Sequence, residues 1–76
     1  MNAPADPCDV AVNGERRTLP GGSTLAELLR AVDIDPVHAQ GIAVAVNDTI
    51  VRRQAWPEVT LQEGDRIEIV NASQGG

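Results

Sequence analysis

The chain has 76 residues, enough for one domain, and a chain this short buries only ~60% of its unfolded surface, which disfavours a large catalytic cleft. Eleven acidic residues against six basic ones give a net charge of -5, which disfavours nucleic acid as a partner and favours basic protein surfaces. A single cysteine excludes an internal disulfide, and we find no pattern of a signal peptide or a long apolar span, so we expect a cytoplasmic protein that does not enter a membrane.

The chain opens with a short polar leader. Residues 1–7, MNAPADP, contain two prolines among small and polar residues and have no apolar periodicity. A segment of this kind has little to bury, so we expect it to be disordered. The folded domain is predicted to cover residues 8–70 and to begin at Cys8.

The first predicted element is a β-hairpin. Val10 and Val12 alternate with other residues, and an Asn13-Gly14 pair follows them directly. This pair between two alternating segments is typical of a type I′ turn, because both turn residues need a positive φ. Such a turn puts Arg17 on the same face as the two valines, where its stem must pack and its guanidinium must reach solvent. A bulged three-residue loop is the alternative.

After the PGG of residues 20–22 the apolar period changes, and the new period predicts an α-helix. One stripe of this helix carries Leu25, Leu28, Leu29 and Val32. Thr24 and Glu27 have the spacing of a capping box, which places the start of the helix. Asp35-Pro36 is expected to mark the end, because the residue before a proline is disfavoured in helical geometry. A helix this short must be stabilised by packing against a sheet.

Three further strands are predicted in the second half of the chain. Residues 42–46, IAVAV, are apolar at every position, as in a strand covered on one face. A turn at residues 47–48 leads to a short strand near residues 50–51. A Glu-Gly turn at residues 63–64 precedes the last strand, residues 67–70, whose isoleucines alternate inward.

The order of these elements predicts the fold. A hairpin, a helix, a strand, a short strand and a last strand follow one another along the chain. A crossover through one helix, with the last strand returning beside the first, places the helix on one face of a mixed sheet. We therefore predict an α+β fold of the β-grasp, or ubiquitin-like, type, in which four to five strands pack on one main helix.

The sequence contains no cluster of side chains typical of a catalytic or metal site. Metal sites need several ligands at defined spacing, and the chain has one histidine and one cysteine. We interpret His38 as a solvated loop residue and Cys8 as the first residue of a strand. Residues 20–24, PGGST, lack the lysine of a phosphate-binding loop and are interpreted as a capped loop. Trp56 is expected to cover the end of the core, with a partner contact as the alternative.

The strongest candidate site is the tail, residues 71–76, NASQGG, which we expect to be flexible. An α-carboxyl group has a pKa of ~3.5, so it is an anion at neutral pH that can attack the α-phosphorus of ATP when an enzyme binds both. The acyl-adenylate then accepts a sulfur or thiol nucleophile and gives a thiocarboxylate or a thioester. We assign the reacting carboxylate to Gly76, clearance in a narrow channel to Gly75, and extended backbone contacts with a partner to Ser73 and Gln74.

The chain after the leader resembles the ThiS family of sulfur carriers. The matching stretches are VNGERRTLP, STLAELL, IAVAVND, VRRQAW, GDRIEIV and QGG. The resemblance implies a carrier, not an enzyme, whose terminal glycine, here Gly76, is adenylated with ATP by a ThiF-type enzyme and converted to a thiocarboxylate. Sulfur would come from cysteine through a desulfurase, or from another donor, and the thiazole synthase ThiG would use it to build the thiazole of thiamine. The carrier itself would bind no cofactor and no metal.

Three other interpretations stay open at this point. MoaD, the small subunit of molybdopterin synthase, and carriers for amino-acid synthesis share the fold and the chemistry, but MoaD usually has more aromatic residues and a Pro-Pro-Val-like lead into its terminal glycines. A ubiquitin-type modifier is disfavoured because all six basic residues are arginines, so chains linked through lysine side chains cannot form. A plain binding module would have a tail without function.

Overall fold

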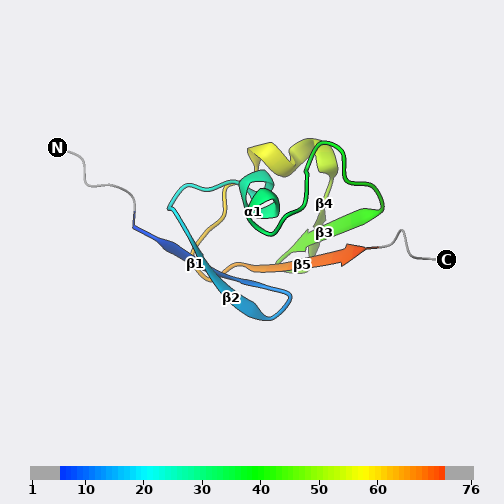
Figure 1. Ribbon diagram of the computed structural model, residues 1–76. Coiled ribbons are helices and arrows are strands. Elements are labelled where there is room, and N and C mark those ends of the chain that lie inside the picture. Colours follow the sequence, from blue (N-terminus) through cyan, green and yellow to red (C-terminus); the bar gives the residue numbers. More distant parts are fainter. Residues whose placement is uncertain (1–5, 72–76) are drawn as a thin grey trace.

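The computed structural model describes residues 6–71, which form a five-stranded sheet with a helix on one face (Figure 1). Along the chain the elements are β1 (Cys8–Val12), β2 (Glu15–Leu19), α1 (Leu25–Ala31), β3 (Ile42–Val46), β4 (Thr49–Val51), the 3-10 helix η1 (Arg53–Glu58) and β5 (Arg66–Asn71). The strand order in the sheet is β2-β1-β5-β3-β4. β5 runs parallel to β1 and antiparallel to β3, which confirms the predicted mixed sheet and the β-grasp topology.

The hairpin between β1 and β2 has the predicted two-residue turn. Asn13 and Gly14 have φ values of 51° and 85°, and the two strands pair directly on either side of them. Two positive φ values are typical of the type I′ turn, so the bulged loop is excluded. Arg17 pairs with Val10 on the helix-facing side of the sheet and is half-buried there, as the two-residue turn requires.

The helix α1 begins where the capping box predicts. The hydroxyl oxygen of Thr24 accepts the N–H of Glu27 at 3.2 Å, and the carboxylate of Glu27 accepts the N–H of Thr24 at 2.9 Å. Just before it, the buried hydroxyl of Ser23 donates to the carbonyl oxygen of Pro20 at 2.6 Å, so this segment is the capped loop that we predicted. The apolar stripe is fully buried at Leu25, Leu28 and Leu29.

The predicted end of the helix, at residues 35–36, is wrong. The helix ends at Ala31, because Asp33 adopts a left-handed conformation with φ of 66°. Ile34 then donates its N–H back to the carbonyl oxygen of Leu29 at 2.8 Å and packs against the core. Aspartate tolerates the left-handed region better than most residues, and the reversal satisfies a carbonyl of the last turn.

The core lies between α1 and the inner face of the sheet. Side chains from the strands complete it at Val10, Val12, Val44 and Ile67. The segment between β4 and β5 contains η1, whose Trp56 is 1% exposed, so the prediction that this ring covers the end of the core is confirmed. A 3-10 helix of this length carries no apolar period, which is why the sequence pattern does not reveal it.

Parts of the predicted leader and tail, residues 1–5 and 72–76, lie outside the described residues. The last strand continues to Asn71, where the description ends. Over residues 6–71, no helix is long and apolar enough to cross a membrane.

Candidate functional site at the end of β5

The predicted site residues Ser73, Gln74, Gly75 and Gly76 lie outside the described residues, but the structure does describe the strand that leads to them. β5 lies in the centre of the sheet, between β1 and β3. Its pairing with β3 extends to its last residue, where Asn71 is opposite Ile42. Figure 1 shows the arrowhead of β5 at the opposite end of the domain from the start of β1. The chain therefore enters the predicted tail from the middle of the sheet.

Two large apolar side chains are exposed beside this point. Val70 is 57% exposed and Ile50 is 67% exposed. Val70 pairs with Ala43 and Ile50 pairs with Ala45, and these alanines flank the fully buried Val44 along β3. Because alternate residues of a strand point to opposite faces, all four side chains lie on the face away from the helix. We call Ala43, Ala45, Ile50 and Val70 the outer apolar patch.

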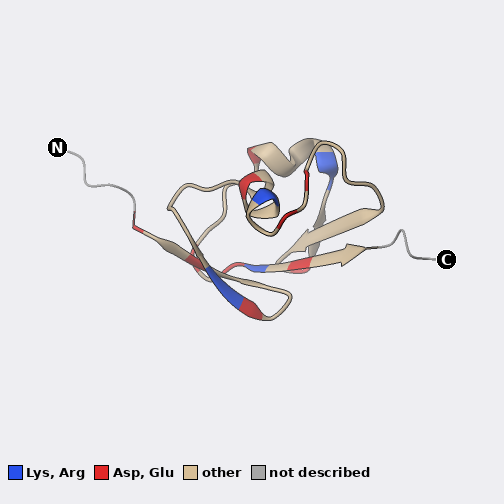
Figure 2. Cartoon of the chain, in the orientation of Figure 1, with Lys and Arg blue, Asp and Glu red and all other residues tan. Residues whose placement is uncertain are grey.

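We did not predict the outer apolar patch as a functional surface. For Val70 a signal was present, since it is out of phase with the inward isoleucines at positions 67 and 69. For Ile50 the sequence contained no such signal, because the face of the sheet on which its side chain lies depends on how β4 pairs with β3. Figure 2 marks acidic residues in red along the hairpin, α1 and β5. One of them, Glu68, pairs with Ala45 and therefore borders the patch on the same face of the sheet.

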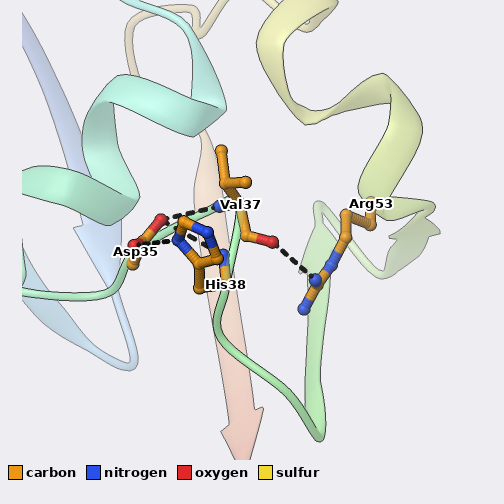
Figure 3. A network of polar contacts seen from close by, with 4 residues as sticks. All are labelled: Asp35, Val37, His38 and Arg53. Atoms are coloured by element: carbon orange, nitrogen blue, oxygen red, sulfur yellow. Dashed lines mark hydrogen bonds and ion pairs between the residues drawn. The ribbon is translucent and has the colours of Figure 1, made fainter.

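A separate polar network fixes the loop between α1 and β3 (Figure 3). One carboxylate oxygen of Asp35 accepts the N–H groups of Val37 at 2.8 Å and His38 at 3.2 Å, and the other lies 2.8 Å from Nδ1 of His38. The bond from the His38 side chain, followed by the two backbone bonds, lowers the pKa of Asp35 to about 2. Arg53 donates to the carbonyl oxygen of Val37 at 3.2 Å and stacks over Trp56, 5.3 Å from the ring centre. The side chain of His38 is 81% exposed, which confirms it as a solvated loop residue.

Cys8 is buried at the start of β1 and is not suited to nucleophilic chemistry. Burial raises the pKa of its thiol, and the neighbouring carboxylates of Glu63, Asp65 and Asp9 raise it further. The thiol therefore stays protonated at neutral pH, whereas a nucleophilic cysteine is a thiolate. In the described part of the chain, no group of three or more His, Cys, Asp or Glu side chains could hold a metal ion.

Known proteins resemble this chain over almost all of its length. The model of the ThiS family matches residues 10–76. The sulfur carrier protein ThiS of Thermus thermophilus is 36% identical over 67 residues, which is 88% of this chain and 98% of that protein. The sulfur carrier protein ThiS of Escherichia coli is 31% identical over 67 residues, or 88% of this chain and 97% of that protein.

A solved structure has the same fold. The crystal structure of the thiamine biosynthesis protein ThiS from Geobacter metallireducens superposes with a TM-score of 0.70 at 26% identity, over 82% of this chain and 90% of that one. A thiazole synthase of Paramagnetospirillum magneticum is 31% identical over 67 residues, which is 88% of this chain but only 20% of that protein. One segment of that larger protein therefore resembles this whole domain.

Proposed function

The chain belongs to the ThiS family, and from this membership we infer that it is a sulfur carrier of thiamine biosynthesis. It acts as a protein co-substrate that partner enzymes load and unload, and not as an enzyme. One observation carries this inference: a single family match covers residues 10–76, so it includes both the β-grasp domain and the Gly75-Gly76 pair.

The proposed chemistry takes place at the carboxylate of Gly76. One of its oxygens attacks the α-phosphorus of ATP on a ThiF-type adenylating enzyme, an acyl-adenylate forms, and pyrophosphate leaves. Hydrosulfide then attacks the carbonyl carbon and AMP leaves, which gives the thiocarboxylate. A persulfide donor would give an acyl disulfide instead, and attack of a thiol on its outer sulfur would release the thiocarboxylate and leave a disulfide. In this scheme the carrier binds no cofactor, because the partner enzyme binds and consumes ATP. This supply of ATP supports a cytoplasmic location.

The tail residues have separate roles in this proposal. Gly76 supplies the reacting carboxylate, and Gly75 supplies a chain thin enough for a narrow channel, because it has no side chain. Ser73 and Gln74 make extended backbone contacts with the partner. An extended chain over residues 72–76 reaches at most ~18 Å beyond the strand, so the adenylating site has to approach the end of β5 closely.

This short reach supports the outer apolar patch as the docking surface for the adenylating enzyme. Val70 lies on the patch directly before the last residue of β5, so an enzyme that takes up the tail must cover the sheet beside it. Burial of Val70 and Ile50 would remove exposed apolar area from water, which contributes ~25 cal/mol for each Å². The domain would thus be held by its sheet while the tail enters the active site.

We propose a thiazole synthase of the ThiG type as the protein that takes the sulfur. The thiazole synthase of Paramagnetospirillum magneticum supports this, since one segment of it is 31% identical to this chain. Two chains that act in consecutive steps gain from being linked, because linkage raises their effective concentration. The sulfur placed on the tail would come from cysteine through a desulfurase, or from another donor.

The test is intact-mass spectrometry of the carrier after incubation with the adenylating enzyme, ATP and a sulfur donor. The native chain is expected to exchange one terminal oxygen for sulfur. Deletion of Gly76, or addition of one residue after it, moves the carboxylate by ~3.5 Å. A displacement of even ~1 Å can cost about 100-fold in a positioned reaction, so both changes should abolish loading.

The fold provides the control for this experiment. Both tail variants should keep the circular dichroism spectrum and the free energy of unfolding of the native chain, since they alter no residue of the described domain. If the shortened or lengthened tail gains sulfur as fast as the native one, the carboxylate of Gly76 is not the reacting group and the proposed function is wrong.

A further inference from the structure

Two asparagine side chains hold the central strand β5, one near each end. Asn13 lies in the turn between β1 and β2, and Asn47 lies in the turn between β3 and β4. Each is the first residue of a two-residue turn, and both have a φ of 51°. The two residues are therefore matched in type, in turn position and in backbone conformation, and they differ in which part of β5 they contact.

Asn13 holds the part of β5 that is nearer to the tail. Its side-chain oxygen accepts the N–H of Ile69 at 2.8 Å, and its side-chain nitrogen donates to the carbonyl oxygen of the same residue at 3.3 Å. Its backbone N–H donates to the carbonyl oxygen of Ile67 at 2.8 Å. A carboxamide carries a donor and an acceptor side by side, as a peptide group does, so it can take the place of a strand residue.

This contact extends the support of β5 beyond the end of β1. β1 pairs with β5 at Arg66 and Ile67 and then turns away into the hairpin. At Ile69 the hydrogen bonds on this side come from the Asn13 side chain, while β3 pairs with β5 on the other side. The strand is thus held from both edges around Ile69, only two residues before the end of the described strand.

Asn47 makes the equivalent contact at the start of the strand. Its side-chain oxygen accepts the N–H of Arg66 at 2.9 Å, and its backbone N–H donates to the carbonyl oxygen of Arg66 at 2.7 Å. Its side-chain nitrogen donates to the carboxylate of Asp65 at 2.9 Å. Loss of Asn47 would loosen the beginning of β5 and leave the contact at Ile69 in place.

We propose that Asn13 is a positioning residue for sulfur loading, because its contact with Ile69 fixes the β1 side of β5 just before the chain leaves the sheet, while β3 holds the other side up to Asn71. This inference rests on the proposed function. When the adenylating enzyme holds the tail extended, residues 70–76 span roughly 25 Å, so a tilt of about 10° of the strand at Ile69 would displace Gly76 by about 4 Å from its place in the active site. An error of even ~1 Å in a positioned reaction can cost about 100-fold in rate, so the direction set at Ile69 matters at the carboxylate.

The test compares variants that keep their turns and lose only the carboxamide. Asn13→Gly is suitable, because glycine adopts a positive φ without strain. With the adenylating enzyme, ATP and a sulfur donor, we expect kcat for loading to fall at least about tenfold, as expected for a misplaced carboxylate. KM should stay within about twofold, because the proposed docking surface is unchanged. Hydrogen exchange at the Ile69 amide should become faster, which verifies that the contact is lost.

Two further variants separate positioning from stability. Asn13→Asp keeps an acceptor for the Ile69 N–H and loses the donor, so its kcat should lie between the values for the native chain and Asn13→Gly. The matched variant Asn47→Gly should keep kcat within about twofold of the native value, because the contact at Ile69 remains. If Asn13→Gly fails to fold, Asn13→Asp takes its place, and its kcat compared with those of the native chain and of Asn47→Gly decides in the same way.

The inference is overturned if kcat for Asn13→Gly equals that of the native chain, or if the Asn47 variant loses as much. Those outcomes leave the proposed function intact when the native chain still acquires sulfur. If the native chain acquires no sulfur, the proposed function fails and this inference fails with it.

Discussion

Trp56 donates its indole N–H to the carbonyl oxygen of Val51 at 2.9 Å from a side chain that is only 1% exposed. The bond joins η1 to the end of β4, and it satisfies the polar atom of a ring that otherwise lies in the core. A buried indole without a partner would carry the cost of desolvating its N–H. The single aromatic residue of the chain thus closes the core and satisfies its own polar group.

Replacement of Trp56 should separate these two contributions. Trp56→Phe keeps most of the apolar volume but leaves the Val51 carbonyl without this donor, so the free energy of unfolding should fall by ~1 to 3 kcal/mol. Trp56→Ala also creates a cavity and should cost ~3 to 5 kcal/mol. Urea denaturation followed by circular dichroism measures both values. A cost below ~1 kcal/mol for the alanine variant would contradict the role of the ring in the core.

The buried stripe of α1 makes a second prediction. Leu28 is fully buried, so Leu28→Ala should lower the free energy of unfolding by ~2 to 5 kcal/mol, a large share of the stability of a domain this small. Arg30 is exposed on the same helix, and Arg30→Ala should change stability by no more than ~0.5 kcal/mol. Equal effects of the two substitutions in equilibrium denaturation would show that the helix face is misassigned.

The Asp35 network predicts a change of stability in acid. The pKa of Asp35 is lowered from 3.8 to about 2 in the folded chain. A carboxyl group whose pKa is lowered on folding stabilises the folded chain at any pH above its pKa in the unfolded chain. This contribution is lost as the pH falls from about 4 to about 2. Asp35→Asn cannot titrate and should lack this component. Denaturation of both proteins at several pH values from about 5 to about 2 measures the difference in the free energy of unfolding. If the free energies of the two proteins change with pH in parallel, the prediction is wrong.

The outer apolar patch predicts a docking defect. Val70→Glu places a charge on the patch and should weaken binding to the adenylating enzyme at least about tenfold, because burial of an unpaired charge is costly. Val37 is also an exposed valine, at 63%, but it lies in the loop between α1 and β3. Val37→Glu is therefore the matched control and should bind within about twofold of the native chain. Calorimetric titration measures both; equal losses would exclude the patch as the docking surface.

The proposed role of Gly75 predicts a loss of loading without a loss of docking. Gly75→Val widens the tail with a branched side chain and should slow sulfur loading by about 100-fold, as expected when a reacting group cannot reach its position. Binding to the adenylating enzyme should stay within about threefold, because the outer apolar patch is unchanged. If this variant gains sulfur as fast as the native chain in the mass-spectrometric assay, the channel of the adenylating enzyme does not require a residue without a side chain at position 75.

Local patterns were sufficient to predict most elements of this fold. The Asn13-Gly14 pair predicts the hairpin turn because the φ values it needs are accessible to few residues. Thr24 and Glu27 predict the helix start because each side chain satisfies the backbone of the other within one turn. Alternation predicts the hairpin and the last strand, an unbroken apolar run predicts β3, and the Gly75-Gly76 pair in this context predicts the carrier. In each case the residues that form the pattern lie within a few positions of the feature that they predict.

Other features depend on residues that are distant in sequence, so only the tertiary structure decides them. The helix ends at Ala31 because Ile34 packs back on the core, and no pattern in the neighbouring residues predicts that contact. Ile50 joins the outer apolar patch only because of the pairing between β3 and β4. Asn13 meets Ile69 across 56 residues of sequence. A turn residue supports the last strand because the parallel pairing places the end of β1 beside the first residues of β5, so that the turn after β1 lies next to Ile69. The register of that pairing is set by the packing of the whole core.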